Sequence, residues 1–143
     1  MVVVAAVDQS DQSDIVVKEG EKISAALDQP LHVVHVMSYA DFYDLQKSSV
    51  EETGSPREME RVKETAETVA TEASDVIDGS SVSVGLVGDA ATEVVDYAKQ
   101  HDTEYIVVGP KKQSPTGKAL FGSVSQSIIL NSPCSVITTS RSE

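Results

Sequence analysis

Residues 105–139 read YIVVGPKKQSPTGKALFGSVSQSIILNSPCSVITT: a strand, a loop with three glycines, a helix and a second strand. The run Tyr105–Val108 is apolar and rich in β-branched residues, which is typical of a strand covered on both faces. Ser123 and Gln126 have the spacing of a capping box, so we expect a helix to begin at Ser123 and to end before a last strand at Ser135–Thr139. Two strands joined by a helix indicate a parallel β-α-β unit.

The same alternation extends over the rest of the chain. Three further apolar runs predict strands at Met1–Val7, Leu31–Met37 and Val82–Val87. Apolar residues at helical spacing predict helices over residues 15–27 and 59–76, and a third helix after Asp89. The alternation predicts a single domain over residues 1–143, with a five-stranded parallel sheet between two layers of helices, an α/β/α sandwich.

Two stretches before the third strand carry more local signals. Ser55-Pro56-Arg57-Glu58 has the pattern of a capping box with proline at the first helical position, so the second long helix is expected to begin there. Ser38–Gly54 is longer than a typical connection. It is either a functional lid or partly helical, around Asp41–Gln46.

Composition excludes several classes of function. The chain has 23 acidic and 11 basic residues and a net charge of −12, so its surface repels nucleic acid. Its apolar runs are far shorter than the ~20 residues that a membrane-spanning helix needs. We therefore expect neither nucleic acid nor a membrane as a partner, and a cytoplasmic location, which the single cysteine also favours. The acidic excess is typical of proteins that stay soluble in high salt and suggests a halophilic source.

One segment departs from this acidic character. Tyr105–Ser142 contains no acidic residue and contains Lys111, Lys112, Lys118 and Arg141. Its loop follows a strand of a parallel sheet, where such sheets bind ligands. Glycines let the backbone approach a ligand, and the N-terminus of the following helix offers N–H groups to an anion. The loop therefore predicts a phosphate site, the alternative being that its glycines serve only turns and a helix cap.

Gly109, two residues, Lys112, nine residues and Gly122-Ser123 form a pattern that resembles the nucleotide-binding motif of the universal stress protein family. That motif has a second glycine where this chain has Lys112. Val7-Asp8 resembles the aspartate that ends the family's first strand, and Gly88-Asp89 resembles the glycine turn before its third helix. The resemblance covers essentially the whole chain and implies the strand order 3-2-1-4-5.

The resemblance implies a stress-response regulator that binds ATP or another adenine nucleotide, ADP or AMP, with or without Mg²⁺. It implies that Asp8 and the backbone of Val36 hold the adenosine, and that the phosphates are surrounded by Gly109, Gly122, Ser123 and Val124. A carboxylate suits ribose hydroxyls, and backbone N–H groups suit phosphate oxygens. Lys112 is expected to donate to a phosphate, the alternative being that its bulk fills the site.

The resemblance also implies a homodimer that pairs through the last strand, Ser135–Thr139, at the edge of the sheet. That strand is β-branched and free of charge, as an edge available for pairing would be. Two other functions stay open. One is a slow ATPase or nucleotide hydrolase, for which only Asp8 is available as a base, so we assign no catalytic residue and no metal site. The other is a family member that binds no nucleotide and acts through protein partners.

Overall fold

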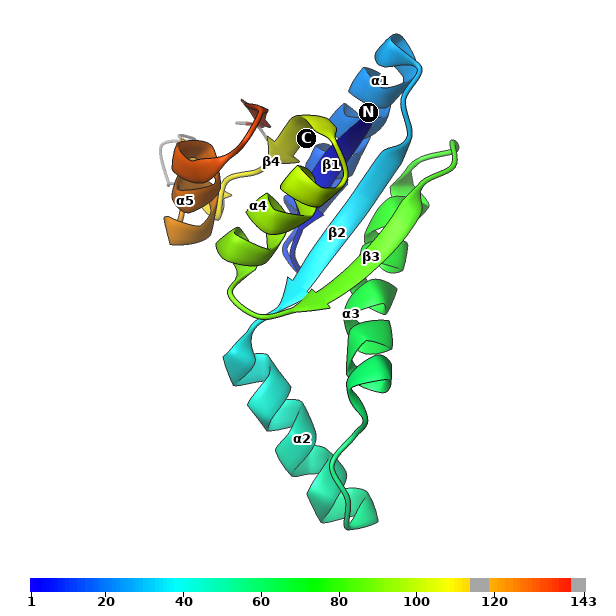
Figure 1. Cartoon of the computed structure of the whole chain (residues 1–143), viewed down its shortest axis with the longest axis vertical. Helices are drawn as coiled ribbons and strands as arrows, with labels where there is room; N and C mark the ends of the chain where they lie inside the picture. The colour runs from blue at the N-terminus through cyan, green and yellow to red at the C-terminus, as the bar shows by residue number, and fades with distance from the viewer. Residues whose placement is uncertain (114–118, 140–143) are drawn as a thin grey trace.

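A computed structural model of the chain, which describes residues 1–113 and 119–139, has one parallel sheet as its framework (Figure 1). The sheet contains β1 (Val2–Val7), β2 (Leu31–Met37), β3 (Val82–Val87), β4 (Thr103–Val108) and β7 (Ser135–Thr138). The strand order is β3-β2-β1-β4-β7, and every neighbouring pair is parallel. The expected order 3-2-1-4-5 is confirmed, with the last strand at an edge.

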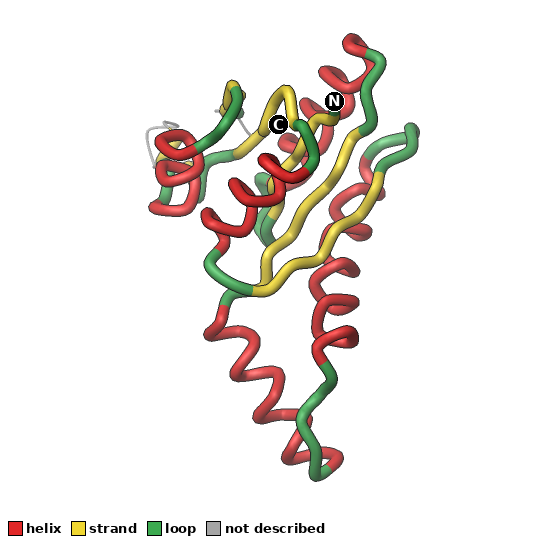
Figure 2. The backbone as a smooth tube through the Cα atoms, in the orientation of Figure 1, coloured by secondary structure: helices red, strands yellow, loops and turns green. Residues whose placement is uncertain are grey.

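Helices connect the strands throughout (Figure 2). They are α1 (Ser13–Leu27), α2 (Tyr39–Thr53), α3 (Met59–Ala73), α4 (Ala90–Gln100) and α5 (Ser123–Asn131), with a 3-10 turn, η1, at Ser74–Val76. Two short antiparallel strands, β5 (Lys112–Gln113) and β6 (Ala119–Leu120), lie between β4 and α5. Lys118 and Arg141 of the positively charged segment lie outside the described residues. None of the helices within the described ranges is long and apolar enough to cross a membrane.

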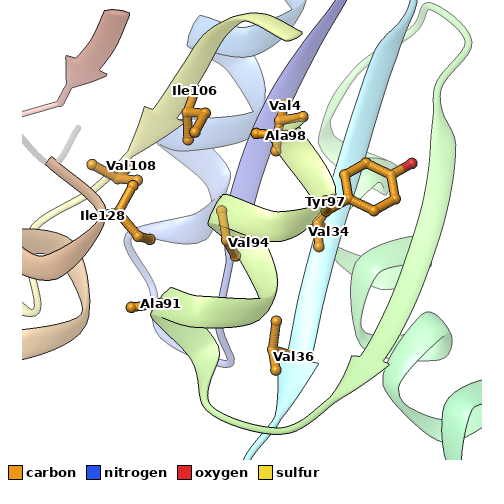
Figure 3. Close-up of a cluster of buried hydrophobic side chains, with 10 residues drawn as sticks. All are labelled: Val4, Val34, Val36, Ala91, Val94, Tyr97, Ala98, Ile106, Val108 and Ile128. Carbon is orange, nitrogen blue, oxygen red and sulfur yellow. The ribbon is translucent and has the colours of Figure 1, made fainter. Parts of the chain in front are cut away.

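The sheet is covered on both faces, which explains the near-continuous valine runs. Successive side chains of a strand point to opposite faces. On β2, Val34 and Val36 therefore pack with α4 and with Ile128 of α5, in the cluster that Figure 3 shows. Val33 of the same strand packs on the other face, where Val16 and Val17 of α1 lie in the same cluster. The chain thus forms the three layers that its pattern predicts.

Gly85 on β3 sets the distance between that strand and α3. A Cβ at this position would lie 2.3 Å from the carbonyl oxygen of Lys63 and 2.3 Å from the amide nitrogen of Glu67, both in α3. No side chain fits against backbone atoms at such distances. The glycine therefore allows the helix to lie directly on the strand.

The stretch between β2 and α3 is more helical than its sequence indicates. Instead of a short helical segment, α2 extends over Tyr39–Thr53 and projects away from the sheet (Figure 1). Ser38 caps it by accepting a hydrogen bond from the amide of Asp41 at 3.2 Å. Gly54 ends it with a left-handed φ of 80°.

The predicted start of the next helix is wrong. α3 begins at Met59, after Glu58, and no capping box forms at Ser55. The side-chain amide of Gln46 in α2 explains the difference. It accepts from the amide of Arg57 at 2.6 Å and donates to the carbonyl oxygen of Arg57 at 2.8 Å. This pairing holds the segment before Glu58 outside the helix.

Candidate functional site

A cavity of about 250 Å³ opens where β1, β2 and β4 end. The strand order reverses at this point, since the chain leaves β1 for β2 on one side and reaches β4 on the other. Six residues that the sequence places in a site line the cavity: Asp8, Val36, Gly109, Gly122, Ser123 and Val124. The seventh, Lys112, has its backbone in β5, and its side chain lies outside what the structure describes.

One wall of the cavity is apolar. Val36, Val94, Val108 and Ile128 belong both to the cavity lining and to the buried cluster on the α4 face (Figure 3). Their side chains come from two strands and two helices, so the wall is part of the core and is rigidly placed. Such a surface suits a flat, weakly polar group.

Asp8 follows β1 directly and is held by its own loop. Its Oδ1 accepts a hydrogen bond from the amide of Ser10 at 2.8 Å. The buried hydroxyl of Ser13 donates to the Asp8 carbonyl oxygen at 2.7 Å and accepts from the Asp8 amide at 3.2 Å. Oδ2 of Asp8 accepts no hydrogen bond from any residue in the described part of the chain. The carboxylate is thus fixed in place with one oxygen available.

Two further polar side chains line the cavity. The Oε1 atom of Gln12 is buried and accepts no hydrogen bond within the described ranges. His35 contacts the carbonyl oxygen of Val7 through Nδ1 at 2.9 Å. Because a carbonyl oxygen only accepts, Nδ1 carries the proton there. His32, three residues earlier, bonds to the hydroxyl of Tyr97 in α4 at 2.6 Å, so the two histidines point to opposite faces of the sheet.

The N-terminus of α5 faces the same cavity without a cap. The helix is preceded by Gly122, so Ser123 is its first residue and not its cap. The predicted capping box is therefore wrong, and Gln126 donates instead to the carbonyl oxygen of Phe121 at 3.1 Å. The first turn contains no acidic residue. Its N–H groups carry a partial positive charge that no acidic residue of that turn and no side chain at the cap position offsets.

The two glycines of the motif meet different neighbours. A Cβ on Gly109 would lie 2.8 Å from Cγ2 of Val16 and 3.2 Å from Oγ1 of Thr139. A Cβ on Gly122 would lie 3.1 Å from Cδ of Lys111. Gly109 is therefore required by packing against α1, whereas the neighbour of Gly122 is a flexible side chain.

Sequence reasoning missed part of the lining. Lys111 lines the cavity, although the family pattern directs attention to Lys112. Gln12 and Ser13, at the cap and the first residue of α1, carry no motif of their own in the sequence. The spacing of Ser10 and Ser13 after Asp8 is a signal that could have identified the loop. Among the described residues, no group of three or more His, Cys, Asp or Glu side chains is placed to hold a metal ion.

The fold recurs in solved structures. A universal stress protein from Archaeoglobus fulgidus is 26% identical over 96% of this chain and 97% of that chain, with a TM-score of 0.62. A structure of the A. fulgidus universal stress protein with dAMP is 23% identical over 96% of each chain, with a TM-score of 0.60. A universal stress protein in complex with cAMP is 21% identical over 99% of this chain and 98% of that chain, with a TM-score of 0.61.

No curated protein sequence matches the chain significantly. The sequence pattern of the universal stress protein family, in contrast, matches residues 1–140. This match covers all five strands of the sheet and every residue that lines the cavity. The chain belongs to the universal stress protein family.

Proposed function

We propose that residues 1–143 act as a single domain that binds an adenine nucleotide in the cavity at the ends of β1, β2 and β4, and that this binding regulates a stress response. One observation carries the proposal. The cavity brings together an apolar wall, a fixed carboxylate and an uncapped helix N-terminus. These are the complements of a base, a ribose and a phosphate.

Each part of a nucleotide has a matching surface. The base would lie against Val36 and the apolar wall behind it. The free oxygen of Asp8 would accept from a ribose hydroxyl, and the buried oxygen of Gln12 would accept from a second one. The phosphate would lie at the N–H groups of Ser123 and Val124, where a helix N-terminus favours negative charge.

Relatives support an adenine nucleotide as the ligand. Solved universal stress proteins are in complex with cAMP and with dAMP, which are both adenine nucleotides with one phosphate. ATP with Mg²⁺ is the larger ligand that the same cavity would take, with its further phosphates extending outward. Asp8 is the one carboxylate in the described lining, so Mg²⁺ would be held through phosphate oxygens.

Isothermal titration with AMP, cAMP, and ATP with and without Mg²⁺ tests the proposal. Native protein is expected to bind, and Gly122→Val is expected to bind more weakly because its side chain would displace Lys111 and narrow the phosphate end. Gly79→Val is the matched control, since a Cβ on Gly79 meets only the end of the Glu21 side chain, which does not line the cavity.

Unchanged affinity in Gly122→Val would place the site elsewhere. The absence of binding by any of these nucleotides would favour a family member that acts through protein partners alone. Release of inorganic phosphate from bound ATP, measured over hours, would favour the slow hydrolase. An Asp8→Asn variant would then show whether the single carboxylate acts as the base.

We also propose that two copies pair through β7. β7 lies at the edge of the sheet and is uncharged. Just before it, the last turn of α5 contains Ile129 and Leu130, whose side chains are 43% and 82% exposed. An edge with unpaired backbone groups beside exposed apolar side chains favours pairing with another chain.

Sedimentation tests the dimer. Native protein is expected to sediment as a dimer, and Ile137→Pro as a monomer, because proline removes a backbone donor from β7. Leu130→Glu is a second variant that leaves the strand intact, and it is expected to weaken the dimer. A native monomer at micromolar concentration in high salt would refute the pairing.

A further inference from the structure

We propose that Lys111 supplies the positive charge that binds the nucleotide phosphate, and that residue 122 is a glycine because the Lys111 side chain crosses over it. The inference rests on the proposed function and assigns within that site the group that selects phosphorylated ligands. The sequence pattern points instead to Lys112.

Geometry is the first support. Lys111 follows β4 by three residues and lines the cavity together with Gly122. Its Cδ, Cβ and Cγ atoms lie 3.1, 3.5 and 3.7 Å from the position that a Cβ on Gly122 would take. The side chain therefore crosses the start of α5 along its length. Its ammonium group is two bonds beyond Cδ, on a side chain that lines the same cavity as Ser123 and Val124 of the first turn.

The backbone of Gly122 is the second support. Its φ and ψ are −83° and −179°, an extended conformation that any residue can adopt. Glycine is therefore not needed there for its conformational freedom. What the missing side chain provides is room for Lys111. In this respect residues 111 and 122 form a matched pair across 11 positions of sequence.

Electrostatics supplies the third support. A cation beside a helix N-terminus is unfavourable, because both carry positive charge. Lys111 also has no carboxylate within 4.0 Å among the described residues, Asp8 included. A lysine with no carboxylate partner in the described ranges thus lines the same cavity as an uncapped helix end, in a chain whose net charge is −12. A bound phosphate would remove this repulsion by interacting with both.

The consequence is a preference for nucleotides over nucleosides. Adenosine would use the apolar wall and Asp8 but would gain nothing from Lys111. AMP would gain a charge-assisted hydrogen bond in addition. The proposed contact therefore predicts that AMP binds more tightly than adenosine, and that the difference depends on Lys111.

Isothermal titration with AMP and with adenosine tests the inference on four proteins: native, Lys111→Met, Lys112→Met and Lys99→Met. Methionine keeps an unbranched side chain and removes the charge. Because Lys111 is exposed and its bond is partly screened by solvent, Lys111→Met is expected to weaken AMP binding about tenfold and to leave adenosine unchanged. Lys99→Met, on the exposed side of α4 and outside the cavity, controls for the change in net charge.

A second arm tests the matched pair. Gly122→Ala places a methyl group against the Lys111 chain and is expected to weaken AMP binding in the native background. In the Lys111→Met background, Gly122→Ala is expected to have little further effect on AMP affinity, because the contact between the ammonium group and the phosphate is already lost. Equal effects of Gly122→Ala in both backgrounds would overturn the crossing geometry.

The remaining outcomes separate this inference from the function it rests on. Native AMP affinity in Lys111→Met overturns the inference and leaves nucleotide binding intact, and so does a loss confined to Lys112→Met. If native protein binds adenosine as tightly as it binds AMP, the inference is likewise overturned and nucleotide binding stands. Native protein that binds neither ligand overturns both proposals. A loss in Lys111→Met that affects AMP alone supports the inference.

Discussion

Alanine substitutions of Gly109 and Gly122, the two glycines at the ends of the loop, are expected to affect stability differently. Gly109→Ala should lower stability, because its Cβ would lie 2.8 Å from Cγ2 of Val16, below normal contact distance. Val16 is 2% exposed and β-branched within a helix, so its side chain has one strongly preferred rotamer and cannot turn away. Gly122→Ala meets only the flexible Lys111 chain and should leave stability nearly unchanged.

The size of the effect follows from the packing. Overpacking of this kind costs about 2 kcal/mol of unfolding free energy. Val16→Ala alone should cost about 2 kcal/mol through lost burial and the cavity it leaves. In the Val16→Ala background, Cγ2 is absent, and Gly109 does not have a positive φ. Gly109→Ala should there be neutral or stabilising by about 0.5 kcal/mol, because alanine restricts the unfolded chain.

Urea denaturation followed by circular dichroism measures all four corners of this double-mutant cycle. We expect a coupling free energy of about 2 kcal/mol between residues 109 and 16. Thr139 adds little to the cost of Gly109→Ala. Its Oγ1 would lie 3.2 Å from the new Cβ, and a small rotation of the hydroxyl relieves that contact. A Gly109→Ala loss below about 0.5 kcal/mol, or an equal loss in both backgrounds, would show that packing against α1 does not require this glycine.

Three further changes have defined outcomes. Gly85→Ala should cost about 3 kcal/mol or prevent folding, because α3 backbone lies where its Cβ would be; a midpoint in urea equal to the native one would contradict this. Burial, and next the charge of His101, lower the pKa of His32, so the folded protein binds fewer protons than the unfolded chain. Stability should then fall as the pH drops below 6.5, and less so in His32→Gln; parallel slopes for the two proteins would refute the cause. Lys112→Gly should change AMP affinity little if Lys111 carries the charge, which titration at two salt concentrations would check.

The strands could be predicted because a buried strand has an almost entirely apolar local sequence. β1, β2 and β4 are covered on both faces, so nearly every position is apolar, and each range was found to within two residues at either end. The order of strands has no such local signal. It depends on which helix covers which face, and only the resemblance to a known family implied it.

The helix starts were less predictable because a cap competes with tertiary contacts. Ser55-Pro56 has a good local pattern, yet Gln46 from another helix holds Arg57 by two hydrogen bonds and delays α3. The pattern at Ser123 failed for another reason. Gly122 already occupies the cap position, one residue before the expected cap, so Ser123 is the first residue of α5.

For the site, sequence could place residues at strand ends but could not orient their side chains. Asp8 and Gly109 each follow a strand directly, so their meeting at one edge of the sheet was foreseeable. Lys111 and Lys112 are adjacent, and spacing alone cannot say which of them turns toward the cavity. The Lys111 side chain lies against Gly122, which leaves room for it. In the sequence motif, Gly122 is only a glycine at the end of a loop, so this contact cannot be predicted.

The start of α5 also stands apart from the other helices that the structure describes. The first turns of α1, α2, α3 and α4 each contain an acidic residue, Asp14, Asp41, Glu60 and Glu93 respectively. Such a residue offsets the partial positive charge of a helix N-terminus. In a chain with 23 acidic residues, α5 has none in its first turn and has Lys111 beside it. Stability alone would favour a carboxylate there, as at the other four ends. The same position favours an anionic ligand only if no carboxylate competes for it, and this is the arrangement that a phosphate site requires.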